Sequence, residues 1–182
     1  GDGQNNRAGL IGGRRWCAVN TIKGRVWIFD DNVDTDQILP GYAMAEAASS
    51  LGRFAMAGSK VADFSQQVQP GDIIVAGKNF GCGSSREQAP VALKLAGVSL
   101  LIAPSFARIF RRNSINIGLP VMLGDIRNEV KTGELIEVDI ESGVILAADR
   151  KLSGQPLAPG VLATVRAGGL INRVRRELGI TT

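Results

Sequence analysis

The chain has 182 residues, of which 45% are hydrophobic and 21% charged, and this is enough apolar material to bury the core of one domain of ordinary size. It contains no histidine and only two cysteines, Cys17 and Cys82, which excludes histidine acid–base chemistry, a disulfide framework and the usual zinc sites. The net charge of +4 is spread over dispersed basic pairs with few aromatics between them, a pattern that disfavours a nucleic-acid partner.

Residues 1–15 are rich in glycine and polar residues and show no periodicity. We interpret them as a flexible N-terminal extension and residues 16–182 as a single domain. No apolar run approaches the length that spans a bilayer, and no charged-then-apolar leader is visible. The cytoplasm is therefore the expected location, or an organelle stroma or matrix if residues 1–15 are the remnant of a processed leader.

Alternating apolar residues in Cys17–Phe29 predict a strand, or a hairpin with a turn at Lys23-Gly24, that leads into an acidic loop. The loop Asp30-Asp31-Asn32-Val33-Asp34-Thr35-Asp36 places oxygens at alternate positions, as calcium loops do. An EF-hand is excluded because Thr35 stands where that loop requires glycine and Gly41 where it requires glutamate. An acidic turn that caps a helix is the structural alternative.

Residues Pro40–Ala57 have a helix-favouring composition interrupted by Ser49-Ser50 and Gly52, so we expect one helix or two short ones. A buried strand over Asp72–Ala76 follows. The elements expected after the next loop are a parallel strand over Val98–Ala103, a helix over Phe106–Asn113 starting at Ser105, a hairpin of Leu135–Asp139 and Val144–Ala147, a strand within Leu152–Leu157, and a helical end over Gly160–Leu178. This alternation of strands and helices predicts an α/β domain.

The loop between the first two α/β strands is the strongest candidate for a binding site. It is rich in glycine and serine and opens into a helix predicted over Glu87–Leu95, so its N–H groups gather at a helix N-terminus, where anions are favoured. Gly81 and Gly83 allow positive φ and a close backbone approach. The hydroxyls of Ser84 and Ser85 can donate hydrogen bonds, and Arg86 offers a planar fork for a carboxylate.

These residues predict a small anionic ligand, because a cation such as Arg86 at a helix N-terminus costs about 0.3–1 kcal/mol unless an anion compensates it. The loop does not fit a Walker A loop, a dinucleotide fingerprint or a nucleophile elbow. A tight strand-to-helix turn capped by serine is the structural alternative.

Three motifs resemble those of a known family when they are taken together: Asn32-Val33-Asp34-Thr35-Asp36-Gln37-Ile38, Asn79-Phe80-Gly81-Cys82-Gly83-Ser84-Ser85-Arg86-Glu87 and Ser105-Phe106-Ala107-Arg108-Ile109-Phe110. In this order and spacing, between Arg25 and Val121, the chain resembles the small subunit of 3-isopropylmalate dehydratase and, more broadly, the swivel domain of the aconitase superfamily. The resemblance implies a swivelling β/β/α domain, a mixed sheet with flanking helices as in the aconitase C-terminal domain. It also implies a hydro-lyase of leucine biosynthesis that interconverts 2-isopropylmalate and 3-isopropylmalate by dehydration and rehydration.

The resemblance further assigns roles to individual positions. It places Ser84, which would take the substrate proton, and Asp36 in catalysis. It implies substrate binding by Ser85, Arg86, Thr35 and Gly83, and a loop that selects substrate tails at Tyr42, Ala43, Met44 and Ala45, for which core packing is an equal alternative.

A [4Fe–4S] cluster is also implied by the resemblance, and it requires three cysteines that this chain lacks. The cluster would therefore sit on a separate large subunit, and this chain is expected to bind no metal itself. Cys82 is expected to be a small packed residue and not a ligand.

The sequence departs from the family at Gln88, where isopropylmalate and aconitate enzymes usually have histidine. Gln37 likewise stands where many superfamily members have histidine, although other small subunits share it. Substrates such as methylmalate, dimethylmalate or homoaconitate therefore stay open. So does a different class, a non-catalytic module that keeps the fold and binds a small anion or RNA.

Overall fold

A mixed sheet forms the centre of the computed structural model, which describes residues 21–180. Within these residues its strands are β1 (Thr21–Ile28), β2 (Ile73–Val75), β3 (Leu100–Ala103), β4 (Val121–Leu123), β5 (Leu135–Asp139), β6 (Val144–Ala147) and β7 (Arg150–Ser153). The spatial order is β4-β3-β2-β1-β5-β6-β7. Strands β1 to β4 pair in parallel, whereas β5, β6 and β7 are antiparallel to their neighbours.

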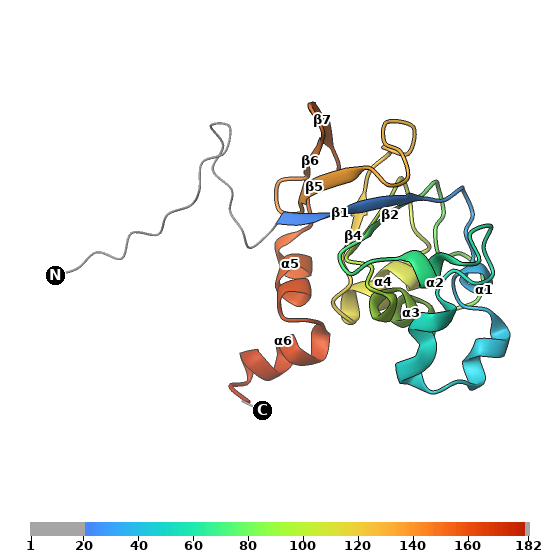
Figure 1. Cartoon of the computed structure of the whole chain (residues 1–182). Helices are drawn as coiled ribbons and strands as arrows, with labels where there is room; N and C mark the ends of the chain where they lie inside the picture. The colour runs from blue at the N-terminus through green and yellow to red at the C-terminus, as the bar shows by residue number, and fades with distance from the viewer. Residues whose placement is uncertain (1–20, 181–182) are drawn as a thin grey trace.

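The helices of the described residues are α1 (Thr35–Ile38), α2 (Phe64–Gln67), α3 (Gln88–Ala96), α4 (Arg108–Asn116), α5 (Pro159–Arg166) and α6 (Leu170–Glu177), with 3-10 helices η1 (Gly41–Ala45) and η2 (Ala48–Phe54). Helices α1 to α4 lie on one side of β1, and β5 to β7 lie on the other (Figure 1). None of the helices between residues 21 and 180 is long and apolar enough to cross a membrane. The mixed sheet with flanking helices confirms the predicted fold class.

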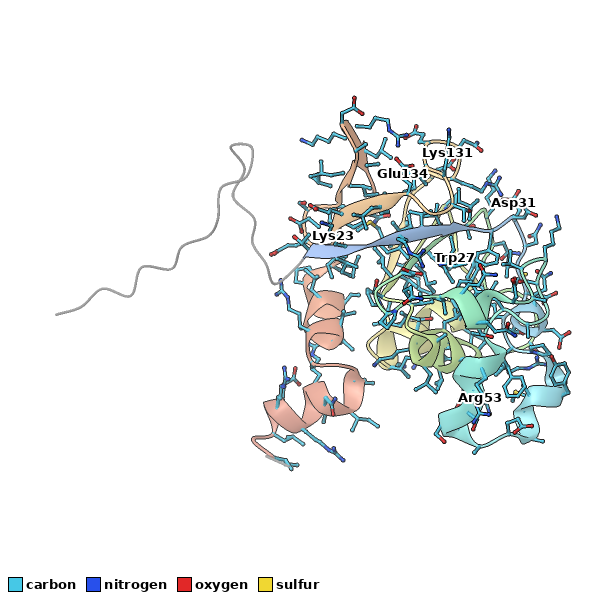
Figure 2. The ribbon with its side chains drawn as sticks, viewed as in Figure 1. Lys23, Trp27, Asp31, Arg53, Lys131 and Glu134 are labelled. Carbon is cyan, nitrogen blue, oxygen red and sulfur yellow. The ribbon has the colours of Figure 1, made fainter. Side chains whose placement is uncertain are left out.

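Both faces of the central parallel strands β2 and β3 are buried, each in its own hydrophobic cluster. In β2, Ile74 packs toward helices α1 to α4, whereas Ile73 and Val75 pack on the other face with residues of β5 and β6. Trp27 on β1, labelled in Figure 2, stacks edge to face on Phe64 of α2, with 4.9 Å between the ring centroids. Burial on both faces explains why β2, β3 and β4 are short, continuous apolar runs, whereas the longer β1 keeps exposed charged residues.

The turn predicted at Lys23-Gly24 is wrong, because β1 runs unbroken from Thr21 to Ile28. Gly24 has a different purpose: a Cβ atom at this position would lie 1.9 Å from the carbonyl oxygen of Gly71. In a strand, glycine can mark a close approach of another backbone as well as a turn. The first part of the predicted segment, together with Cys17 and the extension 1–15, lies outside the described residues.

Four other predicted elements differ in extent, among them the strand expected within Leu152–Leu157, which is β7 and ends at Ser153. The Pro40–Ala57 segment folds as the 3-10 helices η1 and η2. The helix expected from Ser105 begins at Arg108, because Ala107 is the extended N-cap residue. The single helical end is divided into α5 and α6 by two glycines with positive φ, Gly168 and Gly169. Each difference depends on backbone conformation that composition does not specify.

Candidate active site

Three loops meet where β1, β2 and β3 end. Parallel strands that are neighbours in a sheet point their carboxyl ends to the same edge, so the loops that follow them come together there. The N–H of Gly81 donates to the carbonyl of Val33 (2.7 Å), and the N–H of Thr35 donates to the carbonyl of Cys82 (2.8 Å). On the other side, the N–H of Ala107 donates to the carbonyl of Phe80 (2.9 Å). The three sequence motifs therefore form one unit in the fold.

The loop that follows β2, residues 76–87, is the serine loop, and Gly81 holds it against α4. Its φ is +83°, and a Cβ atom there would lie 2.2 Å from Cγ of Phe110. The ring of Phe110 lies edge to face against that of Phe80, with centroids 5.4 Å apart. No side chain larger than hydrogen fits between the loop and the helix, so this glycine is required for both its conformation and its size.

A cavity of about 200 Å³ opens between the serine loop and α4. Ser84 and Ser85 are exposed at this cavity. Its lining consists of Thr35, Gly81, Gly83, Ser84, Ser85, Arg86, Ala107, Arg108, Ile109, Phe110 and Asn113. The cavity thus combines all four predicted substrate-binding residues with the predicted catalytic serine.

The hydroxyl of Ser84 has a buried partner. Its Oγ lies 3.1 Å from Oγ1 of Thr35, whose residue is only 2% exposed. Thr35 begins α1, which Asp34 caps by accepting a hydrogen bond from the N–H of Gln37 (2.8 Å). Within residues 21–180 the backbone N–H groups of Gly83, Ser84 and Ser85 donate to no backbone or side-chain acceptor. These free donors beside Ser84 are suited to an anionic ligand or to negative charge that develops on the hydroxyl.

Arg86 already has an anionic partner inside the chain. Its Nη1 donates to Oδ1 of Asp36 (3.1 Å) and to the carbonyl of Leu39 (2.6 Å), and its side chain is 19% exposed. Asp36 is 71% exposed and can therefore contact a ligand or a partner chain. The cation at this helix end does not by itself require an external anion, because Asp36 supplies part of the compensation. Arg86 is oriented by these contacts, and its remaining N–H groups are free to bind a carboxylate.

The segment predicted to select substrate tails lies next to Asp36 and outside the cavity lining. The N–H of Gly41 donates to Oδ1 of Asp36 (3.1 Å), and Tyr42–Ala45 then form most of η1. Tyr42 is 68% exposed and packs its ring edge to face on Phe54, whereas Ala43 is fully buried in the core. Met44 and Ala45 are exposed. Tyr42, Met44 and Ala45 are therefore accessible to a ligand or a partner chain, and Ala43 anchors the segment in the core.

No role was predicted for the α4 wall of the cavity, which contains Arg108, Ile109 and Asn113. Arg108 belongs to the third motif, and this is the signal that could have pointed to it. Which residues of a helix face a cavity depends on where the helix starts, and α4 starts at Arg108, three positions after the predicted start at Ser105.

The described residues do not fit a metal or iron–sulfur site. Within residues 21–180 no three or more histidine, cysteine, aspartate or glutamate side chains are placed to hold a metal ion. Cys82 is half-buried and carries no disulfide, and its carbonyl binds the N–H of Thr35. A cluster needs several thiolates, which this part of the chain does not supply.

The fold and the converging loops define a class of protein, the swivel-type domain of the aconitase superfamily. Residues 42–124 match the aconitase C-terminal domain family. The chain is 51% identical over 160 residues to the methanogen homoaconitase small subunit of Methanothermobacter thermautotrophicus, covering 86% of this chain and 92% of that protein. It is 49% identical over 161 residues to the isopropylmalate/citramalate isomerase small subunit of Methanocaldococcus jannaschii, covering 86% of this chain and 95% of that protein.

A solved structure gives the same result in three dimensions. The crystal structure of 3-isopropylmalate dehydratase from Methanocaldococcus jannaschii is 40% identical and superposes with a TM-score of 0.83, covering 88% of this chain and 96% of that chain. The chain belongs to the family of 3-isopropylmalate dehydratase small subunits. The resemblance carried by the three motifs is thereby confirmed.

Proposed function

We propose that this chain is the small subunit of a heteromeric hydro-lyase of leucine biosynthesis that interconverts 2-isopropylmalate and 3-isopropylmalate by dehydration and rehydration. The observation that carries the proposal is the cavity in which Ser84, Thr35 and Arg86 meet at the ends of three parallel strands. The family to which the chain belongs supports the reaction class. The cytoplasm, or an organelle matrix if a leader has been processed, stays a prediction.

Each polar residue of the cavity has a proposed task. Ser84 takes the carbon-bound proton of the substrate, and the Thr35 hydroxyl 3.1 Å away positions it. A neutral serine hydroxyl is a weak base, so Ser84 is proposed to act as its alkoxide, whose negative charge the unused N–H groups of the loop stabilise. Accepting the substrate proton returns it to the neutral hydroxyl. Ser85, Arg86 and the backbone of Gly83 hold a substrate carboxylate, while Asp36 keeps Arg86 in place.

The remaining chemistry is proposed to come from a partner. Elimination of a hydroxyl group needs an acid that accepts the leaving oxygen, and a [4Fe–4S] cluster on a large subunit would supply it. The whole sequence has only two cysteines, fewer than such a cluster requires, so this chain is proposed to contribute one half of the active site. The relatives at 49% and 51% identity are themselves named small subunits, which supports a two-chain enzyme.

A second substrate class is favoured by specific relatives. The two proteins described above are named for homoaconitate and for isopropylmalate with citramalate, at higher identity than the structure named for 3-isopropylmalate alone. Tyr42, Met44 and Ala45, with Ala43 beneath them, are proposed to select among these tails from their place beside Asp36. A homoaconitate or methyl-substituted malate enzyme is therefore the alternative.

Reconstitution with the large subunit tests the proposal. The chain alone is expected to be inactive. The complex is expected to dehydrate one member of a panel of isopropylmalate, citramalate, dimethylmalate and homoaconitate. The absorbance of the unsaturated product measures the reaction. Ser84→Ala should lower kcat by roughly 10²- to 10⁴-fold, the usual contribution of a positioned acid or base. Ser142→Ala, an exposed serine in the β5–β6 turn, is the matched control and should keep wild-type activity. Full activity of the chain alone, or of Ser84→Ala in the complex, would contradict the proposal.

A further inference from the structure

Arg108 is the first residue of α4 and lies in the cavity wall beyond the serine loop. Among the described residues that line this cavity, the charged ones are Arg86 and Arg108, and no acidic residue is present. The lining therefore carries a net positive charge. The acidic residues of the loop before α1 lie nearby in the fold but are not part of the lining. A cavity with this lining favours an anion.

The two arginines differ in their partners. Arg86 is 19% exposed, and its Nη1 is bound by Asp36 and by the carbonyl of Leu39. Arg108 is exposed, and within residues 21–180 its side chain makes no ion pair and no hydrogen bond. Arg108 also stands in the first turn of α4, which contains no acidic residue and where the helix dipole disfavours a cation. Among the described residues its charge is thus uncompensated, whereas that of Arg86 is compensated.

We infer that Arg108 binds the second carboxylate of the substrate, while Arg86 holds the first. This inference rests on the proposed function, because it assigns the two ends of the hydroxy-dicarboxylate to two separate guanidinium groups. A guanidinium matches a carboxylate with two parallel hydrogen bonds, and a diacid presents two such groups. Ile109 and Phe110 supply the apolar wall next to Arg108, where an uncharged part of the diacid can lie.

The test uses the complex with its large subunit and compares Arg108→Gln with Arg112→Gln. Arg112 lies one turn further along α4, is exposed and is outside the cavity lining, so its replacement makes the same change of charge on the same helix. Calorimetry measures binding of an alkylsuccinate, which keeps both carboxylates but lacks the reacting hydroxyl. Because a hydrogen bond to a charged group contributes about 1.5–3 kcal/mol, Arg108→Gln should weaken binding roughly 10- to 150-fold. Arg112→Gln should change it less than about twofold.

Two monoamides of the same alkylsuccinate, one for each carboxylate, separate a specific contact from a structural effect. For the monoamide that has lost the carboxylate at Arg108, Arg108→Gln and the wild type should bind alike. For the other monoamide the weakening should persist, and Arg108→Lys should recover part of the affinity. Equal losses with the diacid and both monoamides, or equal effects of Arg108→Gln and Arg112→Gln, would overturn the inference, as would failure of the wild-type complex to bind the diacid. Failure of the wild-type complex to dehydrate any malate while it still binds the diacid would instead contradict the proposed function alone.

Discussion

The connecting loops are arranged differently in the parallel and the antiparallel half of the sheet. In β1 to β3 each loop leaves from the same edge of the sheet, so segments far apart in the sequence meet there. In β5 to β7 the chain reverses at each turn, so consecutive turns lie at opposite edges. Of the described residues, only those of the parallel half, which includes α4, line the cavity that contains Ser84 and Ser85.

The hydrogen bonds of the two halves show the same contrast. In the β5–β6 turn, Oδ1 of Asp139 accepts hydrogen bonds from the N–H groups of Glu141 and Ser142, so the turn is stabilised by its own residues. In the parallel half, the loop at Gly81 is bonded to Val33, which is distant in the sequence. A site assembled from non-local contacts is therefore sensitive to single substitutions that a local turn would tolerate.

Gly81→Ala should have the largest effect, and it tests whether the loop at the parallel edge depends on its contact with α4. The new Cβ would lie 2.2 Å from Phe110 in a backbone with φ of +83°. Strain at positive φ and overpacking together should lower the free energy of unfolding by about 2–5 kcal/mol. Urea denaturation followed by circular dichroism measures this change.

The matched control is Gly133→Ala. Gly133 lies between Lys131 and Glu134, which Figure 2 labels in the loop before β5. Its φ is +89°, but nothing lies within 4 Å of the added Cβ, so only the conformational strain is introduced. The expected loss is about 1 kcal/mol, since a less flexible unfolded chain offsets part of the strain. Equal losses for both variants would show that the contact with α4 adds nothing.

Asp36→Asn should have an intermediate effect that appears in activity more than in stability. The substitution removes the charge that holds Arg86 at 3.1 Å, while the exposed pair itself contributes less than about 1 kcal/mol to folding. A carboxylate-binding group that moves by about 1 Å can reduce turnover about 100-fold, and steady-state kinetics of the complex would show this. Glu137→Gln, which breaks the Lys23–Glu137 pair (3.6 Å) on the antiparallel side, should leave the kinetics unchanged. A similar loss in both variants would remove the distinction between the two halves.

Lys60→Met should have the smallest effect, because its pair with Asp30 lies in the parallel half but outside the cavity lining. The hydrogen bond from Lys60 to Asp30 (2.7 Å) and the charge of Lys60 lower the pKa of the Asp30 carboxyl, and Asp30 in turn raises the pKa of Lys60. The pair therefore stabilises the fold above the ordinary carboxyl pKa of 3.8, and this contribution is lost as the pH falls through the lower pKa of folded Asp30. At the alkaline end it is present below the ordinary pKa of 10.5 and lost as the pH rises through the raised pKa of Lys60.

Thermal unfolding of wild type and Lys60→Met across this range measures the effect. The two proteins should differ slightly near neutral pH and converge at pH 2, and added salt should reduce the difference because both groups are exposed. Kinetics of the complex should not change. An altered substrate KM would show that residues of the parallel half act on the site without touching it.

The local elements were predictable from the sequence where the signal is contained within the element. The hairpin of Leu135–Asp139 and Val144–Ala147 was predicted with its observed bounds, because alternating apolar residues and a Glu-Ser-Gly turn encode it within a few positions. The buried strand β3 and helix α3 were predicted to within about two residues at each end. Gly24 misled the prediction because the atom that requires it, the carbonyl oxygen of Gly71, belongs to a different segment.

The residues of the site were also recognisable in part. The serine loop and the Thr35-Asp36 pair were identified as motifs, and their hydrogen bonds to one another join residues about 50 positions apart. The partner of Arg86 was not predictable, since a guanidinium at a helix N-terminus is equally consistent with an external anion and with an internal carboxylate. The role of Arg108 was hidden because it depends on the residue at which α4 begins.

Composition and short-range patterns were sufficient to predict which residue types are available for chemistry and which short segments form strands, helices and tight turns, because these properties depend on neighbours along the chain. The fold was needed to show that Asp36 compensates Arg86, that Phe110 requires glycine at position 81, and that Arg108 lies in the cavity with no partner of its own among the described residues. The physical reason is that charge compensation and close packing are set by atoms within a few ångströms, and the parallel strands bring those atoms together from segments that are distant in the sequence.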